Sequence, residues 1–187
     1  PSVGDELKLN AVKAVAIASV GMLIYIIFRF KSWKYGLSAI VGVLHDVLMV
    51  IAFYAIFGFT VNNPFIAAIL TLVGYSINDT IVIFDRIREN KALYKKDNSE
   101  INIDRSINST LNRTIMTSLT TLIVMIPLCI MVSSGIREFI LPLMVGVIVG
   151  CCSSIFICSP LYYDLCRGKE ESKYIKQISA SKKKKKK

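Results

Sequence analysis

Residues 65–84 read FIAAILTLVGYSINDTIVIF, an apolar run in which Asp79 is the only charged side chain. A helix rises about 1.5 Å per residue, so a run of roughly 20 residues crosses the hydrocarbon core of a bilayer, which is about 30 Å thick. The chain as a whole is 53% hydrophobic with a mean hydropathy of +0.55, which is more apolar than a typical soluble domain. Four further segments have the same length and character: 12–30, 37–57, 114–133 and 139–163. We predict an all-α polytopic membrane protein with five transmembrane helices.

Lysine and arginine are distributed unevenly among the segments that join these spans. Of the 23 Lys and Arg residues, all but Lys8, Lys13 and Arg137 lie between spans one and two, between spans three and four, or after span five. Cytoplasmic loops of membrane proteins carry such an excess, so we predict that these three segments, including the C-terminus, face the cytoplasm. Five spans then place Pro1 outside. Because no signal peptide precedes Pro1, we expect at least one further span upstream.

The predicted organisation is a helical bundle over residues 1–166, interrupted by a cytoplasmic loop at 85–113 and followed by a basic cytoplasmic tail at 167–187. The tail ends in six lysines. Lysines near a membrane surface each contribute about 1 kcal/mol of attraction to anionic lipids. The sequence leaves open whether the tail is such a lipid anchor or a disordered segment that only marks the topology.

Local signals refine the connections. The charged residues 85–96 continue the helical pattern of the third span, and residues 104–113 begin the fourth helix before it enters the bilayer. Short connections at 58–63 and 134–138 make the spans that they join antiparallel neighbours. The five cysteines form no Cys-x-x-Cys pair and no histidine cluster accompanies them, so we predict no metal site and no cofactor.

Ionisable residues inside the spans are the candidate functional residues, because a charge at the centre of a bilayer costs about 2.5–3.5 kcal/mol on insertion scales. Three lie well inside: His45, Asp46 and Asp79. Arg113 stands at the cytoplasmic entry of the fourth span. Helical spacing places Asp79 in a polar stripe that also contains Thr71, Tyr75 and Asn78.

The fourth span carries its own polar stripe, of Thr110, Arg113, Thr114, Thr117, Ser118 and Thr121. Lipid would leave the polar groups of both stripes unpaired, so the stripes should face each other. We therefore predict a contact between Asp79 and Arg113 within the bundle, lined by hydroxyl groups.

Such a pair suits proton coupling. A desolvated carboxyl group favours its neutral form, whereas a nearby arginine favours the carboxylate, so protonation could release the arginine and move the helices. A static ion pair that only fixes helix packing is the alternative. His45 and Asp46 are either a second relay or a satisfied core histidine beside a polar network. An aspartyl protease dyad of Asp46 and Asp79 is a further alternative, which the different depths of the two residues disfavour.

Several stretches resemble the SecF proteins of the SecD/SecF protein-export family. They are His45-Asp46-Val47, residues 64–71 (PFIAAILT), residues 74–90 (GYSINDTIVIFDRIREN) and Leu111-Asn112-Arg113-Thr114. The resemblance extends from about residue 4 to residue 164, and the long central string is its most specific part. A small-molecule exporter of the same broad superfamily is disfavoured by Asn78-Asp79-Thr80, and a passive assembly subunit remains as another alternative.

The resemblance implies a six-helix SecF bundle similar to resistance-nodulation-division transporters, of which this chain would hold spans two to six. It implies a non-enzymatic subunit of the bacterial cytoplasmic membrane that works with SecD, using the proton-motive force to assist translocation through SecYEG. The implied partners are SecD, SecYEG with SecA upstream, the translocating preprotein and membrane lipids, with no nucleic acid. In the family, the Asp and Arg at the positions of Asp79 and Arg113 are functionally important.

Overall fold

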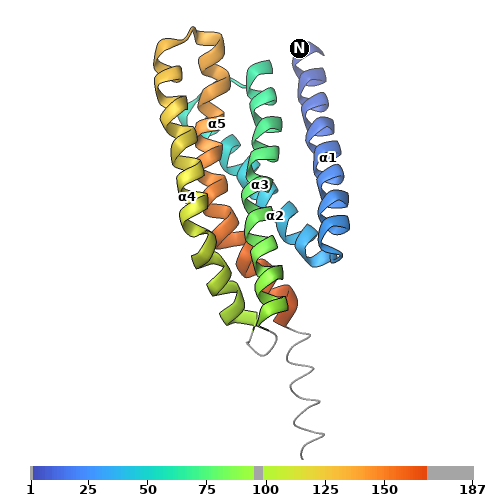
Figure 1. The fold of residues 1–187 in the computed structure, drawn as a ribbon. Coiled ribbons are helices and arrows are strands. Elements are labelled where there is room, and N and C mark those ends of the chain that lie inside the picture. Colours follow the sequence, from blue (N-terminus) through green and yellow to red (C-terminus); the bar gives the residue numbers. More distant parts are fainter. Residues whose placement is uncertain (1, 95–98, 168–187) are drawn as a thin grey trace, which may run out of the picture.

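The structure, a computed structural model, describes residues 2–94 and 99–167. Apart from Arg167, the predicted basic tail lies outside the described residues. Five helices that are long and apolar enough to cross a membrane make up the fold, and the described residues contain no strand (Figure 1). The prediction of a five-helix membrane bundle is therefore confirmed. The helices are α1 (Ser2–Phe30), α2 (Trp33–Phe57), α3 (Asn63–Leu93), α4 (Ser99–Met131) and α5 (Ser134–Ser153).

The helix that begins as α5 does not end at Ser153. It widens into a π-helical segment, η1 (Ser154–Cys158), and then continues as α-helix to Arg167. Pro160 follows η1 closely and has no backbone N–H group, and its ring crowds the carbonyl group four residues earlier. A local π-helical turn accommodates such a disturbance without breaking the helix.

Helices α3 and α4 extend well beyond the apolar part of the bundle and remain paired there. α3 runs to Leu93, and α4 begins at Ser99, five residues before the predicted start. The buried amide of Asn90 donates to Ser106 Oγ at 2.8 Å, and Ser106 Oγ donates to the carbonyl oxygen of Asn102 at 2.6 Å. The bond from Asn90 holds the two helices together where apolar residues are fewer, and the bond within α4 orients Ser106 to accept it.

The other end of the bundle, called here the hairpin end, is closed by two tight connections. Asn62 caps α3 by accepting a hydrogen bond from Phe65 N at 3.1 Å, and its side-chain amide donates to Glu138 at 2.5 Å. The connection between α4 and α5 is shorter than the five residues expected, because residues 134–138 already belong to α5. Arg137 stabilises this tight turn by donating to the carbonyl oxygens of Cys129 and Ile130, at the end of α4.

Helix α3 lies at the centre and packs against each of the other four helices (Figure 1). Small residues permit the close approaches around it. A Cβ atom on Gly146 would overlap the Leu72 side chain of α3, and one on Gly42 of α2 would overlap Cys158 Sγ of η1. The packing of α5 and η1 on α2 and α3 therefore depends on glycines.

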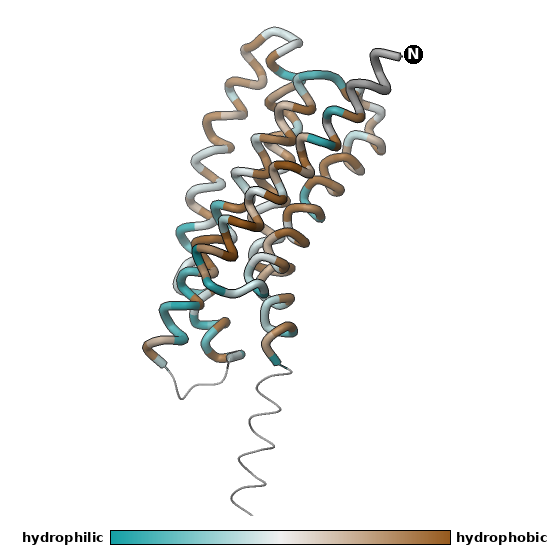
Figure 2. The backbone as a smooth tube through the Cα atoms, turned by 90° about the vertical axis from the view of Figure 1, so that its right-hand side faces the viewer, coloured by the Kyte–Doolittle hydropathy of each residue, from teal (hydrophilic) through white to brown (hydrophobic). Residues whose placement is uncertain are grey.

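The end of the bundle opposite the hairpin end is rich in basic residues and is called the basic end. Figure 2 shows hydrophobic residues along the middle of the bundle and hydrophilic residues gathered at this end. Lys34 Nζ donates to the carbonyl oxygen of Leu165 at 2.5 Å, and Arg29 pairs with Asp85 at 3.2 Å. Stacked and edge-on aromatic rings fill the space behind these contacts: Phe30, Tyr35, Phe84 and Tyr162.

Candidate functional site

The first candidate centre surrounds Asp79, which α3 places at its contact with α4 and α5. The residue is 4% exposed, and its buried Oδ2 atom has no hydrogen-bond partner in the part of the chain that the structure describes. Thr114 Oγ1 and Ser118 Oγ, one helical turn apart on α4, are also buried and have no hydrogen-bond partner in residues 2–94 and 99–167. Cys151 of α5 lies near both Asp79 and Ser118. We call these four residues the Asp79 centre.

Unpartnered buried polar atoms are uncommon in folded proteins and call for a physical explanation. A hydroxyl group can donate or accept a hydrogen bond by rotating. A hydroxyl of Thr114 or Ser118 that turned toward Asp79 would therefore donate to a carboxylate or accept from a carboxylic acid. The arrangement is chemically suited to binding and releasing a proton.

Arg113 does not complete this centre in the way that the sequence predicts. Among the described residues, Arg113 and Asp79 form no ion pair or hydrogen bond, and Arg113 is exposed on the outer side of α4. Successive residues on a helix point about 100° apart, so the inward position of Thr114 turns its neighbour Arg113 away from Asp79. The guanidinium charge of Arg113 is still near enough to act on Asp79.

The two polar stripes meet at only part of their length. Tyr75 OH lies 3.1 Å from Thr121 Oγ1 and 3.5 Å from the carbonyl oxygen of Thr117, which joins α3 to α4. Thr71, Asn78 and Thr117 are exposed. The prediction that the stripes face each other therefore holds for Tyr75, Thr114 and Ser118. Thr71, Asn78, Arg113 and Thr117 form a polar strip on the outer surface of the bundle, whereas Thr110 is buried.

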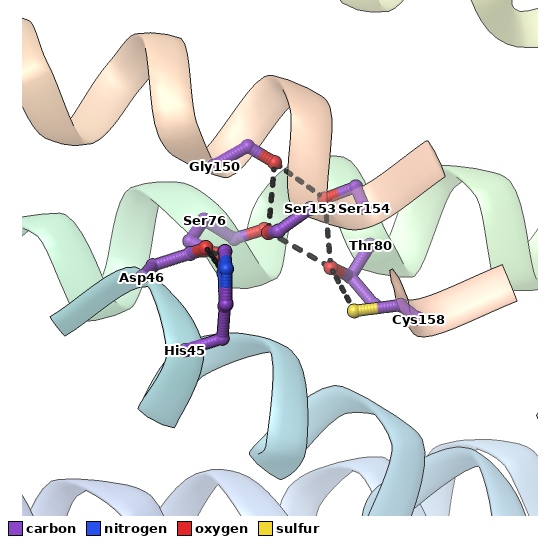
Figure 3. Close-up of polar contacts among 8 residues, drawn as sticks. All are labelled: His45, Asp46, Ser76, Thr80, Gly150, Ser153, Ser154 and Cys158. Carbon is purple, nitrogen blue, oxygen red and sulfur yellow. Dashed lines mark hydrogen bonds and ion pairs between the residues drawn. The ribbon is translucent and has the colours of Figure 1, made fainter. Parts of the chain in front are cut away.

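The second candidate centre surrounds Asp46, halfway along α2, and is shown in Figure 3. The Asp46 side chain is completely buried, and both of its oxygens are engaged. Oδ1 lies 3.2 Å from His45 Nδ1, and Oδ2 accepts a hydrogen bond of 2.5 Å from Ser76 Oγ on α3. Gly150 of α5 faces the pair: a Cβ there would be 3.5 Å from Asp46 Oδ2 and 3.4 Å from Ser76 Cβ. We call His45, Asp46, Ser76 and Gly150 the Asp46 centre.

Buried hydroxyl groups extend this centre toward the basic end (Figure 3). Thr80, one turn after Ser76 on α3, lies 3.0 Å from Ser154 Oγ and 3.7 Å from Cys158 Sγ. Ser154 Oγ donates to the carbonyl oxygen of Gly150 at 2.9 Å, and Ser159 Oγ donates to the carbonyl oxygen of Ser154 at 3.0 Å. The π-helical segment thus lies against a ladder of hydroxyl groups.

Sequence reasoning singled out both carboxylates and His45 but missed the other residues around Asp46. Ser76, Thr80 and Gly150 look like ordinary small residues of apolar helices. The available signal was the spacing of Ser76 and Thr80, which places two hydroxyl groups on a face of α3 adjacent to that of Asp79. The protease dyad does not form, because Asp46 is bonded to His45 and Ser76 and no hydrogen bond joins it to Asp79.

Comparison with known proteins places this bundle among protein-export membrane proteins. Residues 1–168 match the family described as "Protein export membrane protein SecD/SecF, C-terminal". The protein translocase subunit SecF of Sebaldella termitidis is 50% identical over 173 residues, which are 91% of this chain and 56% of that protein. The protein translocase subunit SecDF of Thermus thermophilus is 47% identical over 161 residues, which are 86% of this chain and 22% of that protein.

A solved structure agrees in fold. The crystal structure of SecDF in its super-membrane-facing form superposes with a TM-score of 0.83 at 43% sequence identity, covering 91% of this chain and 23% of that one. The chain thus spans a little over half the length of the similar SecF and less than a quarter of the similar SecDF.

Proposed function

This chain belongs to the SecD/SecF family of protein-export membrane proteins, and from that premise we propose that it acts as a SecF-type subunit of the Sec translocase. With SecD, it uses the proton-motive force to assist protein translocation across the bacterial cytoplasmic membrane, without enzymatic chemistry of its own. The observation that carries the proposal is the buried Oδ2 atom of Asp79, which has no hydrogen-bond partner among the described residues, in a bundle with this family match.

Asp79 is the proposed proton-coupling residue. Ionising it inside the bundle leaves a buried carboxylate oxygen that has no hydrogen-bond partner among the described residues. The Thr114 and Ser118 hydroxyls and the Cys151 thiol lie at the same helix contact, and the charge of Arg113 acts on Asp79 from the outer side of α4. Taking up a proton removes that cost and supplies an O–H group to the same hydroxyls. A proton that crosses the membrane releases about 2.3 kcal/mol per 100 mV of membrane potential, and this free energy would drive the change in helix packing. Arg113, His45 and Asp46 are the other proposed proton-coupling residues.

The outer polar strip is evidence for a membrane partner that carries complementary polar groups. Asn78, Arg113 and Thr117 are exposed, and lipid tails offer them no hydrogen bonds. A partner helix that carries polar side chains would satisfy them, and SecD is the partner that we propose. SecYEG, SecA, the preprotein and membrane lipids follow as partners from the family.

The charge distribution supports the orientation that we propose. The basic end includes Arg29, Lys34, Arg86, Arg88 and Arg105, whereas Lys and Arg at the hairpin end are few. By the positive-inside rule, the basic end faces the cytoplasm.

The test compares gradient-dependent export in membrane vesicles that carry the full-length subunit as wild type or as Asp79→Asn, at equal abundance. Asp85→Asn is the matched control, because Asp85 lies on the same helix but forms an exposed ion pair with Arg29. We expect Asp79→Asn to abolish the dependence of export on the proton gradient and Asp85→Asn to retain it. Unchanged gradient dependence in an assembled Asp79→Asn complex would refute the role of Asp79.

A further inference from the structure

His45 is the only histidine of the chain, and its position is unusual for a membrane helix. It lies halfway along α2, and its side chain is 36% exposed, whereas that of the neighbouring Asp46 is 0% exposed. The exposed surroundings of the ring on α2 are apolar, for example Leu44 and Leu48. His45 Nδ1 faces Asp46 Oδ1, and no hydrogen-bond partner of Nε2 is found among the described residues.

We propose that His45 and Asp46 form a proton-binding centre of their own, distinct from Asp79, which is loaded through His45 and acts on α3 and α5 through Ser76 and Gly150. This inference rests on the proposed function in that it assigns the chain a second site for the coupling ion. Ser76 is a positioning residue of this centre, because its side chain touches only the carboxylate.

The loading step conserves protons and charge. With Asp46 ionised, the neutral ring carries its proton on Nδ1 and donates it to Oδ1, which leaves Nε2 as a free acceptor. A proton delivered to the exposed edge of the ring binds Nε2, and the Nδ1 proton passes to Asp46 Oδ1. The ring ends as the Nε2–H tautomer beside a neutral carboxylic acid, so the charge of the pair changes from −1 to 0 as one proton enters.

Ser76 and Gly150 convey this change to the neighbouring helices. The Ser76 hydroxyl donates to Asp46 Oδ2 at 2.5 Å, and a hydrogen bond to an ionised acceptor is roughly twice as strong as a neutral one. Neutralising Asp46 therefore weakens the bond that ties α2 to α3. Gly150 of α5 lies against this bond and has no side chain between its backbone and the bonded pair. A change in the distance between Asp46 and Ser76 therefore also changes the packing of α5. Cys151, the next residue, lies near Asp79.

The surroundings of Asp46 leave His45 as its main titrating partner. From η1, the Cys158 thiol is near enough for the two charges to interact. From α3, the facing side chains are the hydroxyls of Ser76 and Thr80, while Asp79 lies on the adjacent face. From α1, apolar side chains such as Leu23 pack on α2 at Gly36. In residues 2–94 and 99–167, no lysine or arginine pairs with Asp46.

The single histidine makes a direct test possible. The whole 187-residue chain, labelled with ¹⁵N-histidine and held in lipid nanodiscs, gives the tautomer and protonation state of His45 from ¹⁵N chemical shifts across a pH titration. We expect the Nδ1–H tautomer at high pH and, as the pH falls, uptake of one proton with a change to the Nε2–H tautomer. Asp46→Asn should move the midpoint by about 1 pH unit or more, because an opposite charge at this distance shifts a neighbour by that amount.

Control variants separate this centre from Asp79. Ser76→Ala should shift the midpoint and reduce the Nδ1–H population, whereas Ser118→Ala, which removes a buried hydroxyl from the Asp79 centre, should change neither. Asp79→Asn should also leave the titration of His45 in place. Should Asp79→Asn move the midpoint as far as Asp46→Asn does, the two carboxylates form one centre and the proposal fails. An unchanged titration in Asp46→Asn equally overturns it.

The measurement does not depend on export. A failed export test for Asp79→Asn would remove the proposed function of that residue without altering the ¹⁵N result. Conversely, a negative ¹⁵N result leaves the role of Asp79 untouched. If Ser76→Ala does not fold, Asp46→Asn and Asp79→Asn still decide the question.

Discussion

Gly42 offers the sharpest test of how the π-helical segment packs on the bundle. A methyl group added at this position of α2 would overlap Cys158 Sγ on η1, and Cys158 is only 1% exposed, so the sulfur atom has little room to move. Overpacking of a filled core costs roughly 1–3 kcal/mol. Replacing a helical glycine by alanine otherwise stabilises the helix by up to about 1 kcal/mol.

Gly74 is the matched control, because it lies within α3 and an added Cβ there meets nothing within 4 Å. Both Gly42→Ala and Gly74→Ala gain the same helix propensity, so the difference between them isolates the overlap. We expect Gly42→Ala to be less stable than Gly74→Ala by about 1–3 kcal/mol. The assay is reversible unfolding by SDS titration in mixed micelles, followed by circular dichroism.

A double variant checks the assigned cause. Cys158→Ala removes the sulfur atom that the new methyl group would overlap, and the Cβ of Cys158 would remain 3.9 Å away, at an ordinary contact distance. Gly42→Ala combined with Cys158→Ala should therefore lose less stability than the two single variants added together, with a coupling of about 0.5–3 kcal/mol. Equal stability of the Gly42→Ala and Gly74→Ala proteins, or strict additivity in the double variant, would refute this account of the packing.

Two further predictions concern the hairpin end and the Asp79 centre. Asn62→Ala removes the cap of α3 and the bond to Glu138, so we expect a loss of about 0.5–2 kcal/mol in the same unfolding assay; Ser133→Ala should cost less, because Ser133 makes no side-chain cap bond to α5, and equal losses would contradict the assignment. Thr114→Val removes an unpartnered hydroxyl, so it should leave stability unchanged or raise it while it weakens the gradient dependence of export; a stable variant with normal gradient dependence would show that Asp79 does not use this hydroxyl.

The helices were predictable from the sequence because the bilayer imposes a requirement on each segment separately. Every span must be long and apolar and must satisfy its own backbone hydrogen bonds, so local composition suffices to identify it. Helix ends were less predictable. Residues 134–138 look like a polar connection, yet they are helical because Arg137 reaches back to carbonyl oxygens that end α4. Such a contact depends on the tight turn that it stabilises, and composition does not reveal it.

The residues of the candidate centres also fall into those that the sequence reveals and those that it does not. Rarity within an apolar span was enough to find Asp46 and Asp79, because a buried ionisable group is costly. Their partners depend on how the helices are rotated about their axes. Periodicity placed Arg113 and Thr114 in one broad stripe, whereas rotation of α4 buries Thr114 and exposes Arg113. Ser76 and Gly150 have no such rarity, and only the packing of α3 against α2 and α5 gives them a role.

Asp46 and Asp79 differ in how many of their carboxyl oxygens have hydrogen-bond partners within this chain. This difference affects how the chain would work with a partner. Asp46 has both oxygens engaged by groups of this chain, so its protonation can be set by His45 and Ser76 alone. Asp79 has a buried oxygen that has no partner among the described residues, and Arg113, which acts on Asp79, stands on the outer surface in the polar strip where SecD is proposed to bind. A partner that covers the strip would desolvate Arg113 and so strengthen its attraction to Asp79, because charges interact more strongly where water is excluded. We therefore expect assembly with SecD to change the protonation of Asp79 while that of the Asp46 centre stays the same.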